Sequence, residues 1–134
     1  MKKVSFLCVH NSCRSQIAEG WAKKIGKGII DVYSAGTESY HEVKPLAVEV
    51  MKEVGINLEA QHPKLLMEIP VPDILITMGC NAECPWIPNQ HQEDWELDDP
   101  SGKPIEAFRE TRDIIKAKVI ELIERLQTSD LSDS

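Results

Sequence analysis

The chain has 134 residues, of which 42% are hydrophobic and 28% are charged, a composition typical of one globular domain. This composition excludes a disordered chain, and no apolar run approaches the roughly 20 residues that span a bilayer. The 15 basic and 22 acidic residues give a formal net charge of −7. Such a charge disfavours nucleic acid and anionic membranes as partners, although a small anion can still bind where positive potential is concentrated locally.

The N-terminal segment MKKVSFLCVH starts with basic residues, but its apolar stretch is short and leads into polar NSCRS rather than a cleavage site. We therefore predict no signal peptide and expect a cytoplasmic protein. The chain also holds four cysteines, which are Cys8, Cys13, Cys80 and Cys84. In a reducing compartment, cysteines at this density are more often catalytic, redox-active or metal-binding than structural.

Short β-forming runs alternate along the chain with longer segments of helical periodicity. Buried strands are predicted at three compact apolar runs, residues 3–9, 29–34 and 73–78. Helices are predicted where apolar residues recur at helical spacing, residues 15–25, 45–54 and 104–127. Residues 79–103 lose this periodicity, and we expect a short buried strand within them at residues 95–97.

This alternation predicts an α/β domain over residues 1–127, followed by a polar tail at residues 128–134. We expect a three-layer fold in which helices cover both faces of a four-stranded parallel sheet. Ligands of such sheets bind beyond the carboxyl ends of the strands. Because the first strand ends near Cys8 and the third ends just before Cys80, we expect both thiols at the same edge of the sheet.

Residues 8–15, CVHNSCRS, join the first strand to the first helix. A connection this tight can turn its backbone N–H groups inward and form an anion-binding nest at the helix N-terminus. Arg14 adds a planar pair of donors that suits two oxygens of a tetrahedral oxyanion. The same positive surroundings favour Cys8 as a nucleophilic thiolate. The rest of this loop is expected to bind the anion with Arg14, through Val9, His10, Asn11, Ser12, Cys13 and Ser15.

Two side chains of this loop have further expected roles. The amide of Asn11 can fix the curl of the loop, and the hydroxyl of Ser15 can bond the thiolate or help to cap the helix. Cys13 is expected to be a structural thiol, although its closeness to Cys8 leaves oxidative pairing open.

The loop resembles that of the low-molecular-weight phosphotyrosine phosphatase fold and, within it, of the thioredoxin-coupled arsenate reductases. The resemblance continues through QIAEG and SAGTE to Asp99 followed by Pro100, and covers residues 2 to about 126. It implies that Cys8 attacks the oxyanion centre and that Asp99 protonates the leaving oxygen. From the residues themselves, the like charge of Asp98 and partial burial favour one protonated acid, and two solvated turn acids are the alternative.

Reduction of arsenate to arsenite takes two electrons, so a second thiol must reach the Cys8 adduct. Cys80 and Cys84, in TMGCNAECPW, supply two thiols at the expected edge. This favours an arsenate reductase whose relay is restored by a thioredoxin- or glutaredoxin-type donor. Cys80 lies nearer to the strand, but Gly79 intervenes and the spacing is C-x3-C, so the order of attack stays open.

The main alternative is a phosphatase that hydrolyses phosphomonoesters. The phosphatase relatives tend to place aromatic residues after the Asp-Pro pair to grip a phosphotyrosine ring. Here that position reads Ser101, Gly102 and Lys103.

A non-enzymatic oxyanion- or zinc-binding regulator is the third possibility. The C-x3-C spacing lacks the paired C-x2-C knuckles of zinc sites, and we predict neither a metal nor a cofactor. Some reductases of this family bind potassium through Asn, Glu and Ser, which Asn11, Glu19 and Ser34 match. Their remaining acidic segment reads QHPK at residues 61–64, so an incomplete potassium site is expected.

Overall fold

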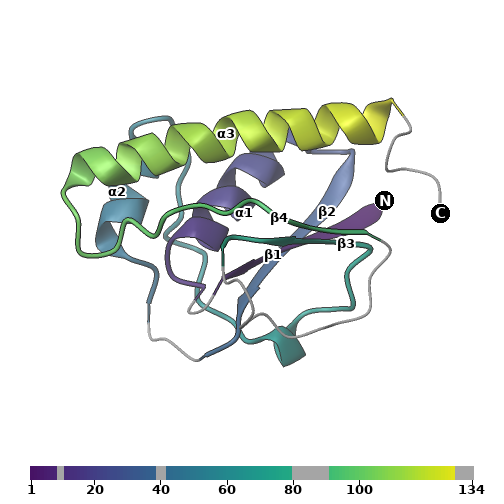
Figure 1. Cartoon of the computed structure of the whole chain (residues 1–134), viewed down its shortest axis with the longest axis horizontal. Helices are drawn as coiled ribbons and strands as arrows, with labels where there is room; N and C mark the ends of the chain where they lie inside the picture. Colours follow the sequence, from purple (N-terminus) through teal and green to yellow (C-terminus); the bar gives the residue numbers. More distant parts are fainter. Residues whose placement is uncertain (9–10, 39–41, 80–90, 129–134) are drawn as a thin grey trace.

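The computed structural model describes residues 1–8, 11–38, 42–79 and 91–128. Its sheet has four parallel strands in the order β2-β1-β3-β4 (Figure 1). The strands are β1 (Lys2–Cys8), β2 (Ile30–Gly36), β3 (Ile74–Thr77) and β4 (His91–Asp94). The prediction of a four-stranded parallel sheet is therefore confirmed.

The fourth strand lies earlier than the sequence predicts. It covers His91–Asp94, whereas residues 95–97 continue as irregular chain. β4 is an edge strand whose residues alternate between half-buried and exposed, so its sequence HQED carries no apolar run that would mark it. Trp95 gave the misleading signal, because its ring is buried and packs against Phe6 although it lies outside the strand.

Three α-helices lie on one face of the sheet: α1 (Arg14–Ile25), α2 (Pro45–Lys52) and α3 (Ile105–Gln127) (Figure 1). α3 is the long helix across the top of the view, and α1 lies between it and the strands. The core between these layers is apolar and fully buried, and full burial of each large side chain contributes roughly 1.5–3 kcal/mol. Its members include Val4, Phe6, Ile17, Met51, Ile74, Ile76, Ile115, Val119 and Leu122. Among the described helices, none combines the length and apolar character needed to cross a membrane.

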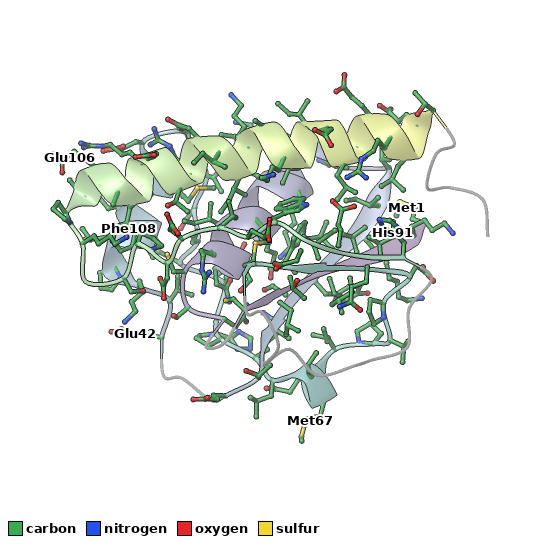
Figure 2. The ribbon with its side chains drawn as sticks, viewed as in Figure 1. Met1, Glu42, Met67, His91, Glu106 and Phe108 are labelled. Atoms are coloured by element: carbon green, nitrogen blue, oxygen red, sulfur yellow. The ribbon has the colours of Figure 1, made fainter. Side chains whose placement is uncertain are left out.

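The opposite face of the sheet is covered by a much smaller element. Leu7, Ala35 and Leu75 form a second buried cluster there, against which Leu66 and Ile69 pack. The covering chain includes a short 3-10 helix, η1 (Leu66–Glu68). Met67 of η1 projects away from the protein (Figure 2). Helices therefore lie on both faces, as predicted, but the two layers are unequal.

The carboxyl ends of β1 and β3 are adjacent. Leu7 pairs with Thr77 in the parallel register, and the next N–H along β3, that of Met78, donates to the carbonyl of Leu7 at 3.0 Å. Cys8 is the last residue of β1 and pairs with Gly36 of β2. Cys8 at the end of β1 and Met78 after β3 thus lie at one edge of the sheet, where the candidate site lies.

Candidate functional site

The sulfur of Cys8 is buried at the end of β1 and lies 2.8 Å from the hydroxyl oxygen of Ser15, in the first turn of α1. The side-chain amide of Asn11 donates a hydrogen bond to the same oxygen at 2.7 Å. An amide nitrogen can only donate, so the Ser15 oxygen accepts from Asn11 and its own proton is available to the sulfur. This chain of donors directs an O–H group at Cys8, which suits a thiolate acceptor.

The loop between β1 and α1 is held by Asn11, whose backbone takes a positive φ of 55°. Asn tolerates this left-handed conformation better than most residues. Its side-chain oxygen accepts from the side-chain amide of Gln16 and from the backbone N–H of Lys64, both at 2.9 Å. The carbonyl of Ser12 accepts from the N–H of Lys44 at 2.7 Å. The curl of the loop is therefore fixed by contacts with three separate segments of the chain.

The N-terminus of α1 has neither a side-chain cap nor an acidic residue in its first turn. The N-cap residue is Cys13. The first N–H groups of a helix carry partial positive charge and attract an anion. Cys13 itself is buried, and burial, together with the charges of Asp99 and Cys8, raises the pKa of its thiol against the opposing effect of Arg14 and Lys44. A thiol that keeps its proton suits the structural role predicted for Cys13.

Arg14 is buried and bonded to the main chain on two sides. Its Nη1 donates to the carbonyl of Met78 and, at 2.8 Å, to the carbonyl of Leu97. Its Nη2 lies 4.0 Å from Oδ2 of Asp99. One terminal nitrogen thus fixes the guanidinium between the chain after β3 and the chain after β4. The other faces Asp99 in the acid loop, as we call residues 95–104 between β4 and α3.

Asp99 is half-exposed, and its carboxylate accepts from the backbone N–H of Ser101 at 3.0 Å. Burial alone raises the pKa of this carboxyl. The backbone and side chain of Ser101, followed by the charges of Arg14 and Lys44, outweigh burial and lower its pKa below the usual value. The sequence-based expectation of a protonated acid is therefore wrong for Asp99, because donors and cations surround this carboxylate in the fold.

The structure brings five predicted site residues to one edge of the sheet: Cys8, Asn11, Arg14, Ser15 and Asp99. Ser12 and Cys13 lie in the same buried loop. Four other predicted residues are outside the described part of the chain, namely Val9, His10, Cys80 and Cys84.

The acceptors of Arg14 could not be predicted from the sequence. The carbonyls of Met78 and Leu97 are main-chain groups, and no residue type marks them in a sequence. Gln16 is a further site residue without a predicted role; it is fully buried and bonds both Asn11 and the carbonyl of His62. Gln16 lies on the polar side of the helix with Glu19 and Lys23, so the sequence gives no signal that it is buried.

Glu19 is one of the three residues that match the potassium ligands of the family, and its side chain is buried. Its Oε1 accepts from the hydroxyl of Ser34 and lies 3.6 Å from Nζ of Lys64, and its Oε2 lies 2.5 Å from Nζ of Lys23. Two ammonium groups already balance this carboxylate, so the donor set does not fit a further monovalent cation. Elsewhere in the described ranges, no three His, Cys, Asp or Glu side chains gather as metal ligands do.

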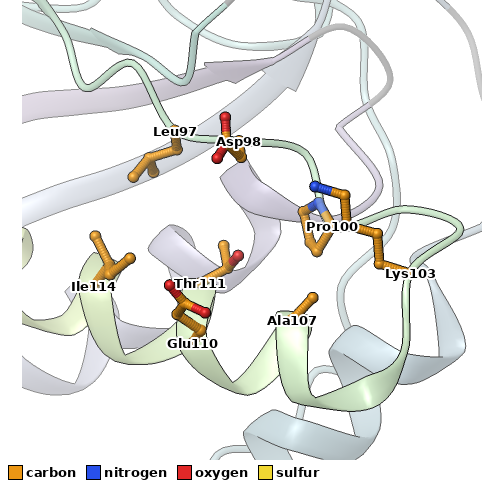
Figure 3. A pocket seen from close by; sticks show the side chains of 8 residues that line it. All are labelled: Leu97, Asp98, Pro100, Lys103, Ala107, Glu110, Thr111 and Ile114. Carbon is orange, nitrogen blue, oxygen red and sulfur yellow. The ribbon is translucent and has the colours of Figure 1, made fainter.

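A cavity of about 100 Å³ lies between the acid loop and α3 (Figure 3). Asp98 and Pro100 reach it from the loop, and Glu110 and Thr111 from the helix. Its eight lining residues are Leu97, Asp98, Pro100, Lys103, Ala107, Glu110, Thr111 and Ile114. No aromatic side chain is among them.

Comparison with known proteins places this site in a family. Residues 3–131 match the model of the low molecular weight phosphotyrosine protein phosphatases. The glutaredoxin arsenate reductase of Synechocystis sp. is 41% identical over 131 residues, which cover 94% of this chain and 99% of that protein. An arsenate reductase of Staphylococcus aureus is 44% identical over 124 residues, or 88% of this chain and 93% of that protein.

A solved structure of an arsenate reductase in the phosphate binding state superposes with a TM-score of 0.86 at 42% identity. The alignment covers 93% of this chain and 98% of that one. With the family match over nearly the whole length, these likenesses settle the family. The chain belongs to the low-molecular-weight phosphotyrosine protein phosphatase family.

Proposed function

We propose that this protein is an arsenate reductase that converts arsenate to arsenite through a Cys8 adduct and a relay of Cys80 and Cys84. The observation that carries the proposal is the Cys8 sulfur, held 2.8 Å from the Ser15 hydroxyl in the first turn of α1, whose N-terminus no side chain caps. This arrangement supplies a nucleophile and an oxyanion site. The relatives named arsenate reductases and the two further cysteines of the chain favour reduction over hydrolysis.

The first step joins arsenate to the enzyme. The Cys8 thiolate attacks arsenic, an S–As bond forms, and one As–O bond breaks as its oxygen leaves in water. Asp99 supplies a proton to this oxygen. The pKa of Asp99 is lowered in the free protein, and a bound anion opposes this shift, since a neighbouring negative charge raises the affinity of a carboxylate for a proton.

The second step is the reduction. The Cys80 thiolate attacks the Cys8 sulfur, an S–S bond forms, and the S–As bond breaks with its electron pair on arsenic. Arsenic passes from the +5 to the +3 state and leaves as arsenite, while two sulfurs are oxidised. Cys80 is proposed to attack first because only Gly79 separates it from Met78, which lies beside the end of β1.

The third step frees the nucleophile. The Cys84 thiolate attacks Cys80, which releases the Cys8 thiolate and leaves a Cys80–Cys84 disulfide. A thioredoxin- or glutaredoxin-type protein then supplies two electrons and restores both thiols. A turnover assay with each donor in turn identifies the partner.

Phosphomonoester hydrolysis is the second candidate, because Cys8, Arg14 and Asp99 would suffice for it with a water molecule. The surroundings of the acid loop argue against a phosphotyrosine substrate. Among the described residues that line the cavity beside Asp98 and Pro100, none is aromatic (Figure 3), and Ser101, Gly102 and Lys103 follow the proline.

The proposal is tested by mapping disulfides after one round of arsenate without external thiol. The wild type should release about one equivalent of arsenite and hold a Cys80–Cys84 disulfide, as the relay requires. Cys80→Ser should bind arsenate but release no arsenite. Cys84→Ser should release about one equivalent and stop as a Cys8–Cys80 disulfide.

Two results contradict the relay. Full multi-turnover reduction by both serine variants would show that neither cysteine is needed. Equal hydrolysis of a phosphoester by all three proteins, without any arsenite, would establish the phosphatase instead.

A further inference from the structure

The segment that carries Cys80 and Cys84 starts after Gly79 and returns to the sheet in β4, and a carboxylate joins its two ends. The N–H of Gly79 donates to Oδ1 of Asp94, the last residue of β4, at 2.7 Å. The same oxygen accepts from the N–H of Glu96 at 3.2 Å. Asp94 therefore connects the residue just before Cys80 with the end of the following strand.

The peptide between Met78 and Gly79 is held at both of its polar groups. Its carbonyl accepts from Nη1 of Arg14, and its N–H donates to Asp94. A peptide unit is planar, so bonds to its C=O and its N–H together fix the orientation of the plane. Asp94 and Arg14 thus orient one peptide from opposite sides.

Gly79 has close backbone neighbours that confine it further. Its φ is +99°, and a Cβ at this position would lie 2.9 Å from the carbonyl oxygen of Leu97. Only glycine takes this conformation at such a distance without strain. The path of the chain at Gly79 is therefore set by the packing on Leu97 and by the bond to Asp94.

Cys80 follows Gly79 directly in the sequence. Consecutive Cα atoms are about 3.8 Å apart, so Gly79 is the last described residue before this cysteine and is one peptide away from it. The Met78 N–H is bonded to the carbonyl of Leu7, directly before Cys8. The last described residue before Cys80 is therefore connected, through Met78, to the residue directly before Cys8.

We propose that Asp94 is a positioning residue for the thiol relay, and that it acts by holding the N–H of Gly79. The inference rests on the proposed function, in which Cys80 attacks the Cys8 sulfur, an S–S bond forms and the S–As bond breaks to release arsenite. Asp94 serves that step and not the earlier binding of the oxyanion, for which Arg14 and the loop are in place without it.

The sheet does not depend on this carboxylate. β4 pairs with β3 through its backbone, and the N–H of Trp95 donates to the carbonyl of Thr77 at 2.9 Å. The ring of Trp95 is buried against Phe6. A variant that lacks the Asp94 carboxylate is therefore expected to keep the strand and the core.

Three substitutions separate the roles of the acceptor and the charge. Asp94→Ala removes both, Asp94→Asn keeps an acceptor without the charge, and Asp94→Glu keeps the charge but displaces the acceptor by one methylene. Asp98→Ala is the matched control, because it removes one negative charge from the neighbouring loop without touching Gly79.

The measurement is single-turnover arsenite release, with disulfides mapped by mass spectrometry, in full-length protein. Asp94→Ala and Asp94→Glu should slow release about 10-fold or more, because one positioning hydrogen bond is lost or misplaced. Asp94→Asn and Asp98→Ala should stay within about twofold of the wild type. In all four variants, inorganic phosphate should protect Cys8 from iodoacetamide as it does in the wild type.

The outcomes are separable. An unchanged rate in Asp94→Ala, or equal slowing in Asp94→Asn and Asp94→Ala, would overturn the positioning role alone. If Asp94→Ala both released arsenite more slowly and lost its protection by phosphate, the positioning role would be overturned as well, because the effect would then lie in the anion site. A wild type that binds phosphate but forms no disulfide with arsenate would overturn the proposed function and this role with it.

Discussion

The hydroxyl oxygen of Ser15 lies 2.8 Å from the sulfur of Cys8, although seven positions separate the two residues in the sequence. The contact results from the short connection between β1, which ends at Cys8, and α1, which begins at Arg14. Asn11 donates to the same hydroxyl and so sets its direction. The Cys8 sulfur and the Ser15 hydroxyl are therefore oriented by the fold itself, before any ligand binds.

Ser15→Ala removes the O–H group that faces Cys8. A hydrogen bond to a charged partner contributes about 1.5–3 kcal/mol, so the reaction of Cys8 should slow by about 10- to 100-fold. The rate of Cys8 alkylation and single-turnover arsenite release, both at fixed pH, measure the effect.

Ser5→Ala is the matched control for Ser15→Ala. Ser5 is as buried as Ser15, but its hydroxyl has no hydrogen-bond partner within the described part of the chain. Its loss should leave both rates within about twofold and the free energy of unfolding within about 0.5 kcal/mol, as for substitutions that break no interaction. Similar rates in the two variants would show that the Ser15 contact has no role in the reaction.

Arg14→Lys should weaken oxyanion binding and slow the attack of Cys8. The guanidinium bonds the carbonyls of Met78 and Leu97 through one nitrogen and keeps a second one near Asp99. A lysine ammonium is a point charge and cannot bond both of these carbonyls and an oxyanion in this geometry. Competition by phosphate against Cys8 alkylation gives the change in affinity.

Two further variants complete this measurement. Arg109→Lys changes an exposed ion pair with Glu53 and should leave the affinity unchanged. Cys8→Ser should abolish the chemistry and still bind phosphate, arsenate or sulfate. If folded Cys8→Ser binds none of these anions, the assignment of the loop is wrong.

The parts of the fold that could be predicted are those with strong local signals. β1 is buried from Val4 to Cys8, and such a strand gives a continuous apolar run. β4 could not be located, because an edge strand with alternating exposed residues has no such run. The boundaries of the helices were close, since prolines and apolar spacing mark them in the sequence.

The site residues likewise divide into those that the sequence places together and those that only the fold brings together. The loop residues Asn11, Arg14 and Ser15 are local to one motif, so the sequence places them together. Burial raises the pKa of Asp99, but the hydrogen bonds from Ser101 and then the charges of Arg14 and Lys44 lower it, so the expectation from Asp98 and partial burial was wrong for this residue. Arg14 and Lys44 are far from Asp99 in the sequence, and only the fold brings them near. Properties that arise from contacts between distant segments carry no local signal.

Asp99→Asn should cut turnover by about 10²–10⁴-fold, the usual range for loss of a general acid. The amide keeps the shape of the side chain and the bond from Ser101 but has no proton to transfer. Asp98→Asn should have a far smaller effect, because Asp98 lines the cavity against α3 (Figure 3). Steady-state rates of arsenite formation compare the two. Equal losses in correctly folded proteins would mean that the acid is shared or lies elsewhere.

The last prediction concerns Glu93, which joins β4 to the end of α3. Its Oε2 accepts from Nε1 of Trp95 at 2.8 Å and from Nη2 of Arg125 at 2.9 Å, and its Oε1 lies 2.8 Å from Nε2 of His91. Burial raises the pKa of this carboxyl, but the hydrogen bonds from Arg125, His91 and Trp95 together lower it from 4.5 to about 2.

A carboxyl with a lowered pKa stabilises the folded state above its unfolded pKa, and this contribution is lost as the pH falls through the folded value. The stability due to Glu93 should therefore be complete above pH 4.5 and disappear between pH 4.5 and about 2. Glu93→Gln should lower the free energy of unfolding by about 1–2 kcal/mol at pH 7, after discounting for partial exposure to solvent. Urea unfolding at pH 7, 4.5 and 3 measures the difference, which should shrink as the pH falls.

Glu121→Gln is the control, because Glu121 faces the same Arg125 at 3.6 Å from an exposed position. An exposed ion pair one helical turn apart contributes only about 0.3–0.5 kcal/mol, so this variant should unfold nearly as the wild type does at every pH. If Glu93→Gln instead keeps a constant difference from the wild type between pH 7 and 3, the loss comes from packing and not from the charge of Glu93. If both variants lose the same free energy of unfolding, the half-buried hydrogen bonds of Glu93 contribute no more than the exposed ion pair of Glu121.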